Sequence, residues 1–576
     1  SAEGNALSTS ESAYAFGIRI GGDLNSEFNN SGDIGASATI SGRYGIANAG
    51  SLHAYGLYVD GDLNGTIDNS GTISAKIKGL ANVARKAEFA IFVEGDSSAG
   101  TLTNSGTING AVQLNGGILN LNGGEINGAI TSVNALDVNI GGEHMSSAID
   151  LAGALVDDFS IRNRGHWILD AAMVDVDRFM VKAGGRLTFA KSSVGLTEDV
   201  SGAGTVAVNA GVSAMLTGDY TQGAGGVFEV MSTNPDDFGQ LTVSGTADLT
   251  ASGGIHVAVE GLVKNDDVIE NILSAGTLTT GALTTTDDSL FYNFNAVKDG
   301  NTIDLETSRD VLVVDAVAAA DLPYANGVAT AIDAILNNGG ASAGIDEVLI
   351  ALGNLGSADD VAQAVAQLVP TMAGQGNQQA QQLANMFSNV VGNRIGGNRG
   401  LSAGDSLYEE RHAWIKPFGG YAEGDERSGV PGFEVDTFGI AVGGDIQHND
   451  KLMLGAGFAW SDSKVDGKTI NTNKLDVESF QLVLYGNYDL NATDFVESYA
   501  IVGFNDNESR RDVAFGGLRS TALAKYDSIF ARIYTGVGRG YRTSEQFMFT
   551  PMATLRYTHI DQDSYTESGA GVLNLN

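Results

Sequence analysis

The sequence predicts an all-β-dominated fold: a right-handed parallel β-helix, a short helical linker, and an incomplete C-terminal antiparallel transmembrane β-barrel. Three observations support this prediction. An 18-residue unit is written twice in tandem, as INGAVQLNGGILNLNGGE (108–125) and INGAITSVNALDVNIGGE (126–143). Residues 313–400 change to helical periodicity, and the chain from Arg411 onward consists of long segments of alternating hydrophobicity.

The tandem repeat predicts a rod of stacked β-coils, which we expect over residues 1–216. A period of roughly 20 residues with Asn and Gly turns is typical of such stacks, because one coil cannot bury its own apolar side. Stacking would align Ile108 with Ile126 and Ala111 with Ala129 in one continuous core. The alternative is an antiparallel β fold with repeated turns, which the tandem disfavours.

A longer repeat covers residues 1–145. The triplet Asn-Ser-Gly begins at Asn30, Asn69 and Asn104, which gives spacings of 39 and 35 residues. Asn and Gly tolerate positive φ, so the triplet predicts a corner between strands. The Thr-Ile pairs at 72–73 and 107–108 then predict strand starts with Thr outward and Ile inward. Residues 146–310 remain β-like but lose the period.

Composition limits the possible functions. The 32 Lys and Arg against 69 Asp and Glu give a net charge of −37, so we expect no nucleic-acid partner. The absence of cysteine excludes disulfides, thiolate metal sites and a cysteine nucleophile. No apolar run reaches the ~20 residues that a membrane helix needs, and we expect any signal peptide to lie outside the sequence.

Residues 217–249 carry two motifs of a known protein family. Residues 217–222 read TGDYTQ, and residues 237–249 read DFGQLTVSGTADL. This resembles the membrane-proximal end of pertactin-like autotransporter passengers, where G-x-Y-x-Q precedes D-x-L-x-V-x-G-x-A-x-L. The strand parity of Leu241, Val243 and Leu249 suits a cap on the rod. The resemblance implies an autochaperone role for residues 217–312.

Residues 313–408 form the predicted helical linker. Ser357 and Asp360 form a capping box, and Pro370 ends the helix that follows. Val361, Val365 and Leu368 lie on one face of that helix. A second helix, predicted over 375–395, is rich in Gln and Asn. Its thin apolar stripe consists of Leu383, Met386, Phe387 and Val390. The alternative is an ordinary surface helix on a globular domain.

Residues 409–576 contain seven long predicted strands. These are His412–Glu426, Val435–His448, Lys451–Gly467, Lys474–Leu490, Asp494–Ala514, Ala522–Thr543 and Gln546–Ser568. They exceed the usual strand length of soluble sheets, and an apolar outside with a polar inside is what lipid and a wet pore demand. We expect an outer band of Phe480, Leu482, Leu484, Ile529, Ala531 and Ile533. We expect Gln481, Arg532 and Arg539 to face the lumen.

The helix followed by long strands resembles the translocator domain of type V secretion autotransporters, and the resemblance covers roughly residues 217–576. It implies that the helix at 375–395 plugs the pore. It also implies an outer-membrane barrel with its passenger at the extracellular surface. The implied partners are outer-membrane lipid, the barrel-assembly machinery and periplasmic chaperones. The family's barrel has twelve strands, whereas this chain stops at GVLNLN while entering an eighth. We therefore expect a fragment at both ends.

We expect no catalytic, cofactor-binding or metal-binding residues. Residues 404–407 spell the esterase signature GDSL, but they lie between helix and barrel and have no downstream Asp-x-x-His. Residues 95–98 read as a corner of the rod. The seven histidines show no metal-ligand spacing, and no G-x-S-x-G occurs. Some family members cut themselves at an Asn in the plug; Asn385, Asn389 and Asn393 lie there, but the cleavage motif is absent.

Two functions of different classes remain. The first is a non-enzymatic autotransporter that displays its rod as an adhesin or surface-structure module, with an unknown cell-surface or matrix ligand. The second is the stalk and translocator of an exported hydrolase, an esterase or protease, whose catalytic domain lies N-terminal to Ser1. The upstream sequence would distinguish them. A plain porin-like barrel is disfavoured, because residues 1–410 precede the strands.

Overall fold

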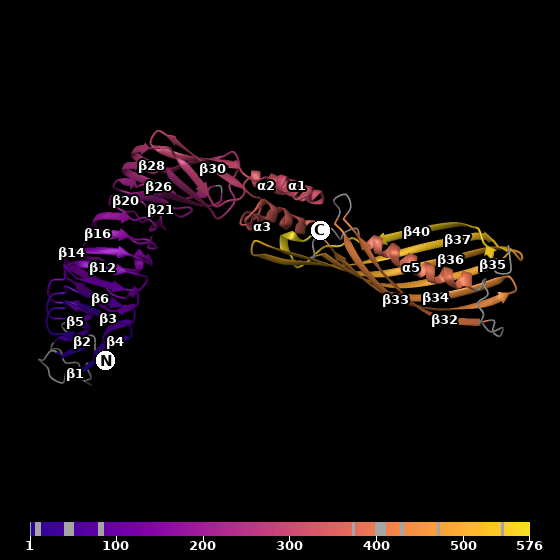
Figure 1. The fold of residues 1–576 in the computed structure, drawn as a ribbon, viewed down its shortest axis with the longest axis horizontal. Coiled ribbons are helices and arrows are strands. Elements are labelled where there is room, and N and C mark those ends of the chain that lie inside the picture. Colours follow the sequence, from indigo (N-terminus) through magenta and orange to yellow (C-terminus); the bar gives the residue numbers. More distant parts are fainter. Residues whose placement is uncertain are drawn as a thin grey trace. The chain divides into compact units, whose positions relative to one another are not determined.

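The computed structural model describes residues 2–5, 13–39, 51–78, 86–234, 236–370, 375–397, 411–426, 431–468, 473–542 and 547–575 (Figure 1). The chain divides into two compact units. The first comprises residues 1–310 and 336–340, and the second comprises residues 311–335 and 341–576.

The first unit is a rod of parallel strands, and its first sheet contains the opening residues of both copies of the tandem repeat. The strands are β1 (Ala2–Asn5), β4 (Asp33–Thr39), β7 (Thr72–Lys78), β10 (Thr107–Asn109) and β13 (Glu125–Ile126). Ile108 pairs in parallel with Ile126, and both side chains are buried. The predicted stacking is therefore confirmed. The second core pair, however, is Val112 with Ile130, and the adjacent Ala111 and Ala129 are only half-buried.

Two further sheets complete the rod. The 18-stranded sheet contains β2 (Ala13–Ile20), β3 (Glu27–Asn30), β5 (Leu52–Val59), β6 (Thr66–Asn69), β8 (Lys86–Val93), β9 (Thr101–Asn104), β11 (Ala111–Leu114), β12 (Gly117–Leu121), β14 (Ile130–Ile140), β16 (Gly153–Ile161), β18 (Val176–Val181), β20 (Val200–Gly202), β22 (Ser213–Leu216), β23 (Tyr220–Gln222), β26 (Gln240–Leu249), β28 (Val268–Thr280), β30 (Tyr292–Asp299) and β31 (Thr302–Arg309). The eight-stranded sheet contains β15 (Glu143–Met145), β17 (His166–Leu169), β19 (Arg186–Phe189), β21 (Thr205–Val208), β24 (Val227–Asn234), β25 (Asp237–Phe238), β27 (Gly254–Val259) and β29 (Thr284–Asp287).

The parallel stack continues beyond residue 146, within the rod expected over residues 1–216, although the sequence repeat is lost there. His166 pairs with Arg186 and Arg186 with Thr205, which gives coils of 20 and 19 residues. Val227, Gly254 and Thr284 then pair over longer coils. The sequence repeat is lost because inward residues such as Trp167, Leu187 and Phe228 need only be apolar, so successive coils share their geometry without sharing a sequence.

The rod ends in antiparallel pairing. β28 pairs antiparallel with β31, and β30 forms a hairpin with β31. The predicted inward parity of Leu241, Val243 and Leu249 is confirmed, since all three are buried in β26. The hairpin gives β28 an antiparallel partner, so this sheet does not end in the bare edge of a parallel strand.

The second unit begins with four short helices and continues into a long one. The helices are α1 (Val313–Ala319), the 3₁₀ turn η2 (Pro323–Ala325), α2 (Asn326–Asn337), α3 (Ala343–Gly353), α4 (Ala358–Leu368) and α5 (Gln375–Gly397). The predicted cap at Ser357 is confirmed, because its hydroxyl accepts from the backbone N–H of Asp360 at 3.2 Å, while the Asp360 carboxylate accepts from that hydroxyl at 2.7 Å. Among the described helices, none is long and apolar enough to cross a membrane.

Seven antiparallel strands form one sheet in sequential order, as the long alternating segments predicted. They are β32 (Arg411–Gly424), β33 (Phe433–Asn449), β34 (Leu452–Gly467), β35 (Asn473–Asp489), β36 (Asp494–Phe515), β37 (Leu518–Arg539) and β40 (Met552–Gln562). The short strands β38 (Tyr541–Arg542) and β39 (Met548–Phe549) pair with each other. The expected eighth strand is wrong. Residues 571–573 form the 3₁₀ turn η3 (Gly571–Leu573) instead.

The seven-stranded sheet has two chemically distinct faces. We call the face toward α5 the lumenal face and the opposite one the outer face. All six residues of the expected outer band are exposed on the outer face, whereas Gln481 and Arg532 are buried on the lumenal face. The expectation for Arg539 was wrong: it has the parity of Val537, lies on the outer face, and pairs with Asp494 at the end of the strand.

Candidate functional site

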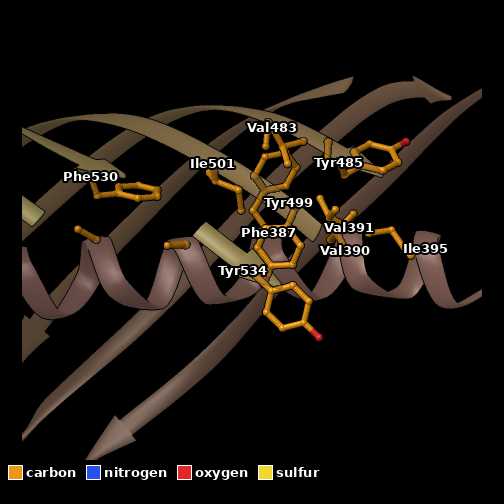
Figure 2. Close-up of a cluster of buried hydrophobic side chains, with 14 of the residues drawn as sticks. Phe387, Val390, Val391, Ile395, Val483, Tyr485, Tyr499, Ile501, Phe530 and Tyr534 are labelled. Carbon is orange, nitrogen blue, oxygen red and sulfur yellow. The ribbon is translucent and has the colours of Figure 1, made fainter. Parts of the chain in front are cut away.

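Helix α5 lies along the lumenal face of the seven-stranded sheet (Figure 2). The predicted helix over 375–395 is confirmed, as is its enclosure by the strands that follow. Leu383 and Phe387 of the predicted stripe are fully buried, Val390 is nearly so, and Met386 is half-buried. The apolar cluster around the helix comprises Ala380, Ala384, Phe387, Val390, Val391, Ile395, Ala441, Met453, Ala459, Val483, Tyr485, Tyr499, Ile501, Phe530 and Tyr534.

Glycines on the lumenal face make room for aromatic rings beside the helix. A Cβ at Gly455 would lie 2.2 Å from Cζ of Tyr485, and one at Gly503 would lie 2.1 Å from Cε1 of Phe530. Each ring therefore lies across a glycine of the neighbouring strand, which shields that backbone and flattens the wall. The result is a smooth surface on which a helix can lie.

The middle of α5 is held by a buried arginine. Arg532 Nη1 donates to Asn385 Oδ1 at 2.8 Å and to Ser388 Oγ at 3.0 Å, while its Nε donates to Thr558 Oγ1 at 2.8 Å. Only 1% of Arg532 is exposed. One guanidinium on β37 thus joins the helix to β40, and hydrogen bonds from a charged donor are stronger than neutral ones.

A second ion pair holds the C-terminal end of α5. Arg394 donates to Asp445 through Nε at 2.8 Å and Nη2 at 3.1 Å, and Asp445 also accepts from the Tyr485 hydroxyl at 3.0 Å. Trp414 Nε1 in turn donates to the Tyr485 hydroxyl at 2.7 Å. The position is favourable for a cation, because the carbonyl end of a helix carries partial negative charge.

The N-terminal part of α5 is held by a neutral contact. Gln379 Nε2 donates to Ser463 Oγ at 2.7 Å, and Ser463 also contacts the Thr437 hydroxyl. The helix is therefore tied to the wall near both ends and in the middle. None of these contacts is covalent, so the arrangement can hold a helix in place and still release it.

The lumenal wall is polar beyond these contacts. Among the described residues, several lumenal oxygens have no hydrogen-bond partner within the protein: Ser461 Oγ, Gln481 Oε1, Asn487 Oδ1, Asn505 Oδ1 and Asn507 Oδ1. Burying such atoms in a dry medium would cost free energy at each one. These unpaired oxygens are compatible with a hydrated lumen and incompatible with a lumen filled by lipid.

Sequence reasoning found the helix but missed the residues that hold it. Asn385 was considered as a cleavage position, and the structure places its side-chain oxygen against Arg532. Asn389 and Asn393 are exposed. Arg394, Asp445 and Gln379 were not singled out. The alternation in β33 could have predicted a lumenal position for Asp445, because it lies on the same face of the strand as Val435 and Ala441.

The other sequence candidates do not assemble into a reactive site. Residues 404–407 lie outside the described residues. In the corner at 95–98, Ser97 is buried and donates to the Gly116 carbonyl at 2.9 Å, which is a structural contact. Within the described ranges, no group of three or more His, Cys, Asp or Glu residues could hold a metal ion.

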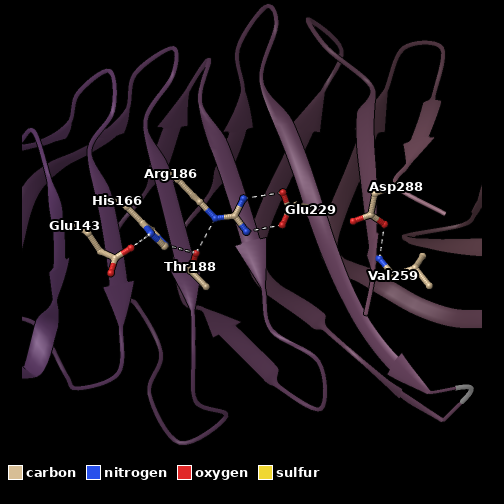
Figure 3. A network of polar contacts seen from close by, with 7 residues as sticks. All are labelled: Glu143, His166, Arg186, Thr188, Glu229, Val259 and Asp288. Carbon is tan, nitrogen blue, oxygen red and sulfur yellow. Dashed lines mark hydrogen bonds and ion pairs between the residues drawn. The ribbon is translucent and has the colours of Figure 1, made fainter. Parts of the chain in front are cut away.

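A polar network on the rod joins neighbouring coils (Figure 3). His166 lies 3.1 Å from Glu143 Oε2 through Nδ1 and 2.9 Å from Thr188 Oγ1 through Nε2. Arg186 donates to Thr188 at 3.2 Å and to Glu229 at 2.7 Å. Thr188 is buried, so its hydroxyl is not presented to a substrate. The network cross-links strands of the rod.

Comparisons with known proteins agree with this geometry. Residues 413–576 match the family model described as the autotransporter beta-domain. Outer membrane protein B of Rickettsia typhi is 25% identical over 321 residues, covering 52% of this chain and 20% of that protein. Outer membrane protein A of Rickettsia conorii is 36% identical over 192 residues, covering 31% and 9%.

Two further proteins are more distant. An extracellular serine protease of Serratia marcescens is 23% identical over 168 residues, covering 29% of this chain and 16% of that protein. The translocator domain of autotransporter NalP from Neisseria meningitidis has 17% identity and a TM-score of 0.25, covering 32% of this chain and 64% of that one. The chain spans a fifth or less of the length of these curated relatives.

A seven-stranded sheet that is apolar outside, polar inside and occupied by a preceding helix defines an outer-membrane translocator. Together with the family match, this geometry identifies residues 413–576 as an autotransporter beta-domain. The barrel strands belong in the outer membrane, and the β-helical rod is the passenger at the cell surface.

Proposed function

We propose that the displayed passenger acts by binding, as an adhesin or surface-structure module, and that the chain itself is not an enzyme. We further propose the layout expected from the sequence: passenger at 1–216, autochaperone-like end at 217–312, helical linker and pore helix at 313–408, and translocator at 409–576. The proposed partners are outer-membrane lipid, the barrel-assembly machinery, periplasmic chaperones, and an unknown ligand on a cell surface or matrix.

The observation that carries the binding proposal is an aromatic outer face on the rod. We define this aromatic face as Tyr14, Phe16, His53, Tyr58, Phe89 and Phe92, on strands β2, β5 and β8. Tyr14 stacks on His53 at 4.5 Å between ring centroids, and Tyr58 stacks on Phe92 at 5.2 Å. Tyr14 is 52% exposed. Aromatic side chains on a solvent-facing surface are typical of contact sites rather than of plain solvated faces.

The experiment displays the full chain on a bacterial host and measures adhesion to cultured epithelial monolayers and to immobilised fibronectin. We expect adhesion above that of the host without the chain. The double variant Tyr14→Ala with Tyr58→Ala should lose adhesion roughly fivefold or more, as substitution of a contact aromatic usually does. Met215→Ala removes an exposed side chain elsewhere on the rod and serves as the matched control. Equal adhesion with and without the chain on both surfaces would contradict the proposal.

The second candidate is a translocator and stalk for an exported hydrolase. The Serratia marcescens relative, whose name is extracellular serine protease, favours it. Under this candidate, cells that display the chain together with the coding sequence upstream of Ser1 should cleave fluorogenic casein or p-nitrophenyl esters, and a serine-directed inhibitor should stop the reaction. Under the binding proposal, these cells show the same rates as the host alone.

A further inference from the structure

The hairpin of β36 and β37 extends well past the length that a membrane requires. Each strand has 22 residues, whereas a tilted transmembrane strand needs roughly 9–11. The far tip is a turn at Gly516 and Gly517, both with positive φ. This tip lies at the end of the barrel from which α5 begins, because Gly376 of α5 lies beside Tyr526 of β37.

The lumenal face of the projecting hairpin is covered. Val513 and Phe515 continue the odd-numbered row that contains Tyr499 and Ile501, which pack in the cluster around α5. Val513 is 1% exposed and Phe515 is 9% exposed, while Ala514 between them faces outward and is exposed. Apolar side chains beyond the helix-filled part of the lumen are buried only if something else lies on them.

Helices α3 and α4 make direct contact with this hairpin. The side-chain oxygen of Gln367 in α4 accepts from the backbone N–H of Ala514 at 2.8 Å. The Ala351 carbonyl of α3 lies so close to Gly516 that a Cβ there would be 2.0 Å from its oxygen. The α3 carbonyl can approach the turn this closely because residue 516 has no side chain.

The same helices are joined to the plug by a short connection. Helix α4 ends at Leu368, Pro370 follows, and α5 begins at Gln375. Six residues span at most roughly 20 Å when extended, so the position of α4 restricts how far α5 can move along the lumen.

We infer that α3 and α4 form an external latch, a second closure of the translocator that is distinct from the plug helix. Docked on the β36–β37 hairpin, the latch covers the lumenal face outside the membrane span and keeps α5 from sliding outward. The three contacts of α5 with the barrel wall then act together with the latch, and release of the latch permits opening. This inference goes beyond the proposed binding function and does not depend on it.

Two adjacent glycines provide a matched test. Gly516→Ala and Gly517→Ala place the same methyl group in the same positive-φ turn. The first methyl collides with Ala351, and the second has nothing within 4 Å. The full chain is reconstituted in planar lipid bilayers, and channel opening is recorded. We expect Gly516→Ala to raise the open probability at least roughly tenfold, as overpacking a contact shifts an equilibrium by that order. Gly517→Ala should match the parent.

A second pair of variants tests the contact if the turn variants fail to insert. Insertion is checked by heat-modifiable migration. Gln367→Ala removes the oxygen that accepts from Ala514 and should raise opening roughly fivefold, whereas Gln367→Glu keeps an accepting oxygen and should restore closure. Equal opening of Gly516→Ala and Gly517→Ala, or of Gln367→Ala and the parent, would overturn the latch.

Discussion

Two arginines on one strand show how position sets the cost of a charge. Arg532 lies mid-strand on the lumenal face, where Asn385, Ser388 and Thr558 take its hydrogen bonds. Arg539 lies on the outer face at the end of the same strand and pairs with Asp494 at 2.7 Å. An arginine on the lipid side costs roughly 2–4 kcal/mol at the bilayer midplane but only about 0–1 kcal/mol near the interface. The outer position is therefore tolerated only at the strand end.

Ile126 tests the packing of the rod. Its side chain is 3% exposed and lies against Ile108 of the preceding coil. Ile126→Asp should destabilise the rod by on the order of 3 kcal/mol or more, because it leaves an unpaired charge in an apolar core. The urea midpoint of the rod measures the loss. The control variant Asn127→Asp introduces an aspartate at the next position, whose side chain is exposed. It should change the free energy of unfolding by no more than about 0.5 kcal/mol.

His144 makes the rod sensitive to acid. Burial lowers the pKa of its imidazole, whose Nε2 accepts from the backbone N–H of Gly123 at 3.3 Å. The unfolded chain, with a histidine pKa of about 6.5, therefore binds the proton more readily than the folded one. The stability contribution is complete above about pH 6.5 and is lost as the pH falls from there through the folded pKa.

The variant His144→Gln keeps an acceptor for Gly123 and removes the titration. Between pH 7 and pH 5, the urea midpoint of the variant should fall less than that of the parent. In the parent, the titration of His144 lowers the free energy of unfolding by up to about 1.4 kcal/mol per pH unit. Trp167 pairs with His144 in register and reports the local unfolding by fluorescence, once Trp414 and Trp460 are replaced by Phe. An identical acid dependence in parent and variant would show that His144 is not the group responsible.

The corners of the rod are held by a ladder of buried asparagine side-chain amides. Asn30 donates to Asn69 at 2.7 Å, and Asn69 donates to Asn104 at 2.8 Å. All three side chains are buried. The ladder satisfies polar groups inside the rod and fixes the register of successive coils, since a shift by one residue would leave each amide unpaired.

The sequence predicted those elements whose periodicity is strict. All seven barrel strands were located to within a few residues at most ends, because alternation over 11 to 22 residues leaves one register. Helix α5 was located because its start and stripe are local signals. The rod was expected as far as residue 216, but no sequence repeat marks its coils beyond residue 146, since inward positions accept any apolar residue. The pairs Arg394–Asp445 and Gln379–Ser463 bring together residues 51 and 84 positions apart, which no local pattern reveals.

The hydrogen bonds from Arg532 to α5 can be tested by substitution. Arg532→Gln removes a charged donor that contacts two helix residues, so the amides of α5 should exchange roughly tenfold or more faster, as loss of a charged hydrogen bond predicts. Hydrogen exchange on the full chain in detergent measures the protection. Arg539→Gln removes a charge from the same strand without touching the helix and should leave exchange in α5 unchanged. Faster exchange in both variants would mean that the strand, rather than the contact, was disturbed.

The molecule as a whole assigns different tasks to its two units. The rod is stabilised along its length by contacts between neighbouring coils, so it can grow from one end as coils are added. The barrel unit presents an apolar outer band to lipid and a polar lumen to the chain. A composition without cysteine suits a chain that crosses a narrow passage, because no disulfide can form before the crossing is complete. The net charge of −37 over the whole chain opposes self-association.

The rod lies outside the cell, and we expect the short turns of the barrel to lie on the opposite side of the membrane. Since the chain has no cysteine, single cysteines can be labelled without background. Asn127→Cys lies on the exposed side of the rod, and Asp450→Cys lies in the turn between β33 and β34. In intact cells that express the full chain, a membrane-impermeant maleimide should label Asn127→Cys at once and Asp450→Cys only after the outer membrane is permeabilised. Labelling of Asp450→Cys in intact cells, with Asn127→Cys protected, would contradict the account.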